Sequence, residues 1–183
     1  MQRLRTDVVR SLLHTGTLAP VVSYVPHIRT RCTIMTPSGL HQDTFELQRF
    51  IAAQDPLYST VTAELRRGRK QMHWMWFIFP QVIGLGRSSM AMRYAIRSRE
   101  EASAYLAHPL LSGRLLECTE LVLGNTEKTA HDIFGSPDDM KFRSSMTLFS
   151  AVSARAIFQT AIDRFYEGIP DEATLAIMAN WPS

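Results

Sequence analysis

Cysteine, long apolar runs and familiar catalytic motifs are scarce or missing in this chain of 183 residues. The two cysteines, Cys32 and Cys118, make neither a disulfide framework nor a metal motif, and they fit a reducing compartment, so we expect a cytoplasmic location. No apolar run approaches the roughly 20 residues of a membrane-spanning helix, so we expect no membrane partner. There is no phosphate-binding loop, nucleophile elbow, HExxH or paired CxxC motif. The six histidines lack ligand-like spacing, so the sequence predicts no metal and no cofactor.

Charge is spread unevenly along the chain. Residues 1–42 carry five arginines and one aspartate, whereas residues 43–183 carry 15 basic and 16 acidic residues. The near-neutral body makes nucleic acid an unfavoured partner. Residues 1–42 also hold several prolines and glycines with little periodicity, so we expect a poorly ordered N-terminal extension, with Met35 as a candidate natural start. Residues 43–183 are expected to form the folded domain.

The body of the chain shows helical spacing of apolar residues, and no run alternates strictly enough for a strand. The sequence therefore predicts an all-α fold, a single compact multi-helix domain. Helix start and stop signals divide it. Starts are expected at Asp43, Asp55–Pro56, Ser88 or Ser89, Ser98, His108–Pro109, Ser136–Pro137 and Asp171, and ends at Gly68, Gly124, Gly135 and Gly168. One unbroken helix from residue 137 to residue 167 would reach about 45 Å, so we expect a break near Ser150–Ser153.

The densest apolar stretch is Trp74–Phe79, bracketed by Lys70, His73 and Gln81. Its aromatic side chains each bury on the order of 150–250 Å², so the stretch must lie in the core. One interpretation is a core segment whose histidine is satisfied by neighbours. The other is the wall of a ligand pocket, in which Lys70, Trp74 and Gln81 bind the ligand. His73 is then the candidate catalytic acid or base, because its side chain titrates near neutral pH.

A glycine-containing loop follows this stretch and leads into a predicted helix. Backbone N–H groups at Gly84 and Gly86, together with Arg87 and Ser88, would suit an anionic ligand. The alternative is an ordinary loop with a helix cap. No acidic residue occurs from Leu65 to Arg99, where eight basic residues lie, which fits either a cationic pocket or a solvated basic face.

A third polar group lies within residues 138–147. Asp139, Lys141 and Ser144 fall on one or two helical turns, and we take them as further ligand-binding candidates. The alternative is helix capping and a solvated face. The hypothesis of a shared site requires these side chains to meet the aromatic stretch in space.

Several motifs together resemble a known family. They are Phe45-x4-Phe50 through Ala53–Gln54, Gly68-x-Lys70-x-x-His73-Trp74-Met75-Trp76-Phe77-Ile78-Phe79-Pro80-Gln81, Gly84-Leu85-Gly86, Tyr94-Ala95-Ile96, His108-Pro109-Leu110-Leu111, and Asp139-Met140-Lys141 with Ser144–Phe149. They resemble domain-of-unknown-function family 1810, over about residues 45–175. The resemblance implies a small all-helical domain and supplies no activity. Some members carry a calpastatin label, but this chain lacks the extended repeats which that label implies.

The sequence thus defines neither a reaction nor an oligomeric state. Our first hypothesis is a ligand-binding domain, with or without enzymatic activity, for a small anionic or nucleotide-like molecule beside the His-Trp-Met-Trp-Phe segment. The second is a non-catalytic protein-interaction module that uses surface arginines such as Arg97 and Arg99.

Overall fold

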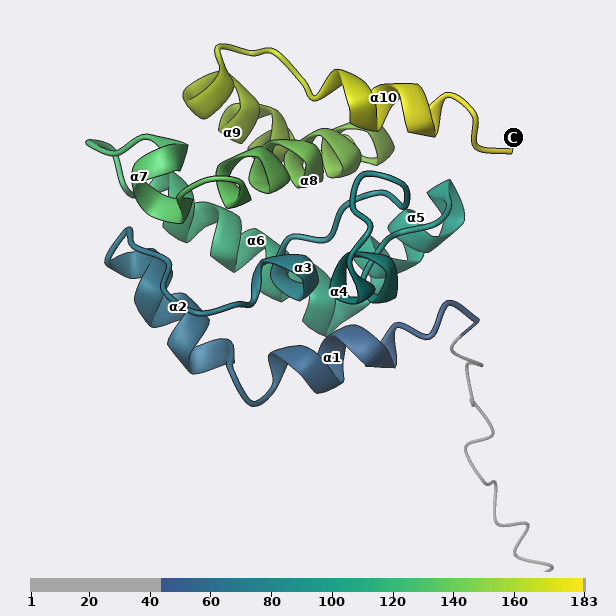
Figure 1. The fold of residues 1–183 in the computed structure, drawn as a ribbon, viewed down its shortest axis with the longest axis horizontal. Helices are drawn as coiled ribbons and strands as arrows, with labels where there is room; N and C mark the ends of the chain where they lie inside the picture. The colour runs from purple at the N-terminus through teal and green to yellow at the C-terminus, as the bar shows by residue number, and fades with distance from the viewer. Residues whose placement is uncertain (1–43, 183) are drawn as a thin grey trace, which may run out of the picture. The chain divides into compact units, whose positions relative to one another are not determined.

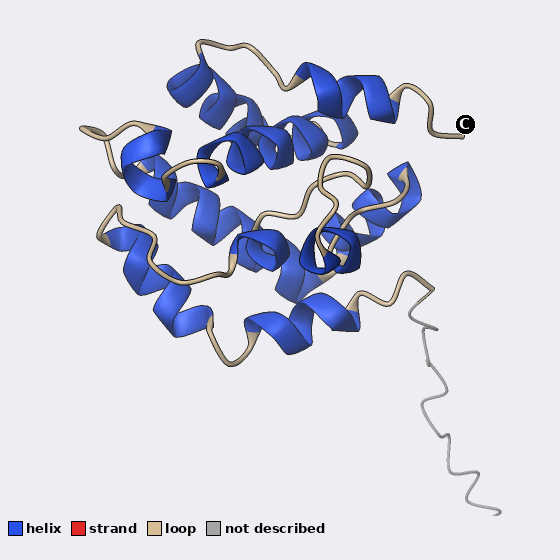
Figure 2. Cartoon of the chain, in the orientation of Figure 1, coloured by secondary structure: helices blue, strands red, loops and turns tan. Residues whose placement is uncertain are grey.

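The computed structural model describes residues 44–182, and the predicted N-terminal extension lies outside this range. The described part contains ten α-helices and no β-strand (Figure 2), which confirms the all-α prediction. The helices are α1 Gln48–Gln54, α2 Tyr58–Arg66, α3 Met75–Ile78, α4 Ser89–Arg93, α5 Arg99–Ala107, α6 Pro109–Leu123, α7 Ala130–Phe134, α8 Asp138–Val152, α9 Ala156–Tyr166 and α10 Glu172–Met178. None of these helices is long and apolar enough to cross a bilayer.

Helices α6 and α8 are central to the domain. Figure 1 shows α1 and α2 along one side, α9 and α10 along the opposite side, and α6 and α8 between them. Helix α8 packs against α9, α7, α10, α5 and α3, and α6 packs against α2, α9, α5 and α3. The short helix α3 therefore lies in contact with both central helices, and it brings the tryptophan segment into the core.

Aromatic rings fill much of this core. Phe142 of α8 lies 4.9 Å from Phe79 and 4.9 Å from Phe134 between ring centroids. Phe50 meets Tyr105 edge to face at 5.1 Å. Each of these rings is buried, so the aromatic pairs add directional contacts to the area that they remove from water.

Most of the predicted helix boundaries are confirmed. The hydroxyl oxygens of Ser88 and Ser98 accept hydrogen bonds from backbone N–H groups at the starts of α4 and α5, and Asp171 caps α10 in the same way. Gly68 follows the end of α2 with φ +60°, and a Cβ there would lie 2.1 Å from the side-chain oxygen of Asn125. The expected break also occurs, because α8 ends at Val152 and α9 begins at Ala156.

Three predicted starts are wrong by one to five residues. Helix α1 begins at Gln48 rather than near Asp43, which lies outside the described residues. Helix α2 begins at Tyr58, two residues after Pro56, and α8 begins at Asp138 with Pro137 rather than Ser136 in the cap position. None of these three helices has a side-chain cap hydrogen bond, so the residue at which each begins is not marked by a local capping contact.

Helix α4 is shorter than the apolar pattern suggested. It ends at Arg93, and Ala95–Ile96 continue in an extended path. The Ile96 N–H donates to the Gln81 carbonyl at 2.8 Å, and the Ile83 N–H donates to the Ile96 carbonyl at 2.9 Å. This isolated parallel bridge between Val82 and Ile96 fixes the segment that follows the tryptophans.

Candidate functional site

The loop before α3 is built around a buried carboxylate. Glu64 of α2 is 2% exposed and accepts hydrogen bonds from the Trp74 indole N–H at 2.8 Å, the Gln71 backbone N–H at 2.8 Å and the Met72 backbone N–H at 3.2 Å. Burial alone would raise the pKa of Glu64, but these three donors outweigh it and hold the pKa below its usual range. The carboxylate therefore stays charged and fixes the loop that carries Lys70.

Lys70 and Lys141 share one acidic partner. The ammonium of Lys70 lies 2.7 Å from Oδ2 of Asp138, and the ammonium of Lys141 lies 2.7 Å from Oδ1 of the same residue. Burial tends to raise the pKa of Asp138, but the hydrogen bonds and charges of Lys141 and Lys70 more than offset this, so the pKa is lowered. Two positive charges thus meet one negative charge at Asp138, and the charged Glu64 carboxylate, which interacts electrostatically with Lys70, is a second negative charge nearby.

Each lysine also lies over a tryptophan ring. The Lys70 ammonium is 5.3 Å from the centroid of Trp74, and the Lys141 ammonium is 4.7 Å from the centroid of Trp76. Trp74 is fully buried, whereas Trp76 is half-buried. We call Lys70, Lys141, Asp138 and Trp76 the lysine cluster. The predicted binding residues Lys70 and Lys141 are therefore brought together beside the aromatic segment.

The lysine cluster has hydrogen-bonding capacity to spare. An ammonium group has three N–H donors, and each lysine gives one to Asp138. Within residues 44–182 the remaining donors have no acceptor, although the side chain of Lys70 is only 8% exposed. Spare ammonium donors beside an indole are features that suit an anion with a flat ring system.

His73 lies on the surface instead of in a pocket. Its side chain is exposed, and none of the described residues forms a hydrogen bond or ion pair with its imidazole. A catalytic histidine usually has a partner that orients the ring. Its role as a general acid or base stays a prediction.

Backbone conformation and close packing explain the two glycines, Gly84 and Gly86, in the loop that follows the tryptophan segment. Gly84 has φ +103°, and a Cβ on Gly86 would lie 2.6 Å from the Cβ of Ala91. Ser88 uses its hydroxyl to cap α4, and Arg87 is exposed. A Cβ on Gly84 would meet α10 at 3.5 Å. Among the described residues, no hydrogen bond or ion pair joins this loop to the lysine cluster.

The remaining predicted residues take part in contacts of other kinds. Oδ2 of Asp139 lies 3.0 Å from Nδ1 of exposed His131 and accepts a hydrogen bond when that nitrogen is protonated. Ser144 donates to the Met140 carbonyl at 3.1 Å and to Asp171 at 3.0 Å, which ties α8 to the start of α10. Gln81 contributes its backbone carbonyl to the bridge with Ile96. The side chains of Asp139 and Ser144 are therefore used in contacts within the domain, whereas Gln81 contributes only its backbone.

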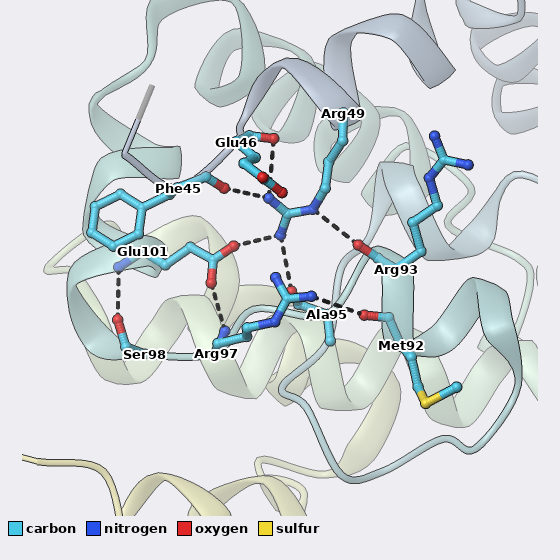
Figure 3. Close-up of polar contacts among 9 residues, drawn as sticks. All are labelled: Phe45, Glu46, Arg49, Met92, Arg93, Ala95, Arg97, Ser98 and Glu101. Atoms are coloured by element: carbon cyan, nitrogen blue, oxygen red, sulfur yellow. Dashed lines mark hydrogen bonds and ion pairs between the residues drawn. The ribbon is translucent and has the colours of Figure 1, made fainter. Parts of the chain in front are cut away.

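Sequence reasoning missed a second buried polar centre, around Arg49 (Figure 3). Its guanidinium has five N–H donors, and all five bond: to the carbonyls of Phe45, Glu46, Arg93 and Ala95, and to the carboxylate of Glu101. The only signal in the sequence was a charged residue next to buried positions on short helices, which is common on surfaces. No group of three or more potential metal ligands occurs in the described part of the chain.

Fold and site define an all-helical domain with a buried tryptophan segment and an adjoining lysine cluster. Residues 44–178 match the model of the family described as "Protein of unknown function (DUF1810)". This is well over half of the chain, which therefore belongs to that family, as the motifs predicted.

A solved structure supports the same assignment. The chain is 51% identical to the conserved hypothetical protein Rv1873 from Mycobacterium tuberculosis, with a TM-score of 0.74. The similarity covers 75% of this chain and 99% of that chain. No curated protein matches this chain. Neither matching description states an activity.

Proposed function

We propose that this domain binds a small anionic ligand with a flat ring system, of which a nucleotide is the model, at the lysine cluster. One observation carries the proposal: a buried and a half-buried ammonium group share a single carboxylate beside the half-buried ring of Trp76. Asp138 holds both lysines in place, and each ammonium keeps N–H donors that no residue between 44 and 182 accepts. A phosphate or carboxylate group would accept the spare N–H donors, and the indole would pack against the ring system.

The test is a binding titration of the full chain with AMP, ATP, ribose 5-phosphate and inorganic phosphate, followed by calorimetry. We expect at least one of the nucleotides to bind, and Lys141→Gln and Lys70→Gln each to raise its Kd about tenfold, the loss of one charge-assisted hydrogen bond. Arg99→Gln is the charge control, because Arg99 carries the same charge as the lysines but is exposed and makes only a 3.4 Å contact to the Ala151 carbonyl. The proposal fails if none of the four compounds binds, or if both lysine variants bind as the wild type does.

A second candidate function is supported by exposed apolar side chains that flank the lysine cluster. Met72, two residues after Lys70, is 43% exposed, and Met140, next to Lys141, is 47% exposed. Methionine, tryptophan and a few cations are typical of protein interfaces. If the module binds an acidic protein segment here, Met72→Ser with Met140→Ser should abolish capture of that segment and leave nucleotide binding unchanged. A cytoplasmic setting is part of both proposals.

A further inference from the structure

A small open hollow lies away from the lysine cluster, beside the Arg49 centre. It has a volume of about 250 Å³, and it lies between the residues that precede α1 and the start of α5. Its walls are Thr44, Phe45, Glu46, Arg97, Ser98 and Glu101. Pockets for drug-sized ligands usually measure about 300–1,000 Å³, so this hollow suits a smaller molecule.

The charge of Glu101 is balanced within the protein. One of its carboxylate oxygens pairs with the guanidinium of Arg49, and the other accepts the Arg97 backbone N–H at 2.8 Å (Figure 3). Glu101 is 2% exposed. The charge of Glu101 is therefore neutralised by Arg49. The remaining charges that line the hollow are those of the Glu46 and Arg97 side chains.

Glu46 and Arg97 carry opposite charges and line the same hollow without pairing. Both side chains are exposed, and neither forms an ion pair with any residue between 44 and 182. The Arg97 guanidinium makes a single long contact, 3.5 Å to the Met92 carbonyl. A molecule that carries both signs could contact both of these charges, which form no ion pair within the described residues.

Hydrogen bonds from Arg49 fix the backbone conformation at Glu46. Its φ is +52°, a conformation that side chains other than glycine adopt uncommonly. The guanidinium of Arg49 donates to the Phe45 and Glu46 carbonyls and so holds the turn. The direction in which Glu46 leaves the backbone is thus set by the buried Arg49 centre.

We propose that the hollow binds a small zwitterion, an α-amino acid or a close analogue. The ligand carboxylate would meet the guanidinium of Arg97, the ligand ammonium would meet Glu46, and an apolar side chain would pack on the ring of Phe45. The site shares no residue with the lysine cluster, so it does not depend on the function proposed above.

The experiment is a thermal-shift screen of the full chain against the twenty common L-amino acids at millimolar concentration. We expect at least one to raise Tm by roughly 2–4 °C, as ligand binding to the native state requires. For that amino acid, the N-acetyl derivative lacks the ammonium and the amide lacks the carboxylate. Both derivatives should lose the shift in wild-type protein.

Variants then assign the site. Glu46→Gln and Arg97→Gln should each raise the Kd at least about tenfold while leaving the Tm of the unliganded protein unchanged, because both side chains are exposed. Lys141→Gln should bind the amino acid as the wild type does, which separates this site from the lysine cluster. The inference is overturned if no amino acid shifts Tm, if either derivative shifts it equally, or if both charge variants bind normally.

Discussion

Arg49 and Glu101 form a buried ion pair although 52 residues separate them in the chain. Their side chains are 9% and 3% exposed. The other N–H groups of Arg49 donate to four carbonyls, two in the turn before α1 and two at and just after the end of α4. One side chain thus joins these two segments and, through Glu101, helix α5. The ion pair holds these segments together, and the Arg49 guanidinium has no N–H group left to donate to a ligand.

Removing Arg49 should destabilise the domain strongly. Arg49→Ala leaves Glu101 buried without its partner, which costs about 3–5 kcal/mol in comparable cases. Arg49→Lys should recover little, since three donors cannot replace five. Urea unfolding measures the change. Arg66→Ala, which breaks an exposed pair with Glu117, is the control and should cost at most about 1 kcal/mol.

The Glu64 carboxylate should be needed to hold the loop before α3. All three N–H groups donate to one oxygen of Glu64, Oε2, and Glu64→Gln removes the negative charge from this shared acceptor. We expect a loss of about 1–3 kcal/mol in unfolding free energy and faster amide exchange at Gln71 and Met72. Unchanged exchange at these two amides would show that the loop is held by other contacts.

Asp138 should make stability depend on pH in the acid range. Its pKa is lower in the folded state than its ordinary value of about 3.9. Its stabilising contribution is therefore complete above that value, and it is lost as pH falls through the lower folded-state pKa. The difference in unfolding free energy between wild type and Asp138→Asn should be constant above about pH 5 and shrink below it. A difference that grows on acidification would contradict this.

Cys118 should be inert in the native protein. It is fully buried on α6, and burial raises the pKa of its thiol to about 12. In a Cys32→Ser variant, which leaves Cys118 as the remaining thiol, reaction with an aromatic disulfide reagent at pH 8 should be slow. The same variant in denaturant should react at once. Rapid labelling of the native variant would mean that α6 opens readily.

Two members of the lysine cluster could be predicted from the sequence, and a third could not. Lys70 and Lys141 were predicted because they flank aromatic and capping motifs, and the structure does bring them together. Asp138, which joins them, was not among the predicted binding residues. Nothing local shows that its carboxylate turns toward a lysine 68 positions earlier in the chain, because that contact exists only once α3 and α8 pack together.

The amino-acid sequence alone determined the all-α class, the family, most helix caps and the break between α8 and α9, because these depend on neighbouring residues and on the helical period. Tertiary packing decided where α1 and α2 begin, that His73 lies on the surface, and that Glu64, Arg49 and Glu101 are buried. A charged side chain is buried only when distant segments supply its partners. That pairing is a property of the assembled fold, and no local pattern contains it.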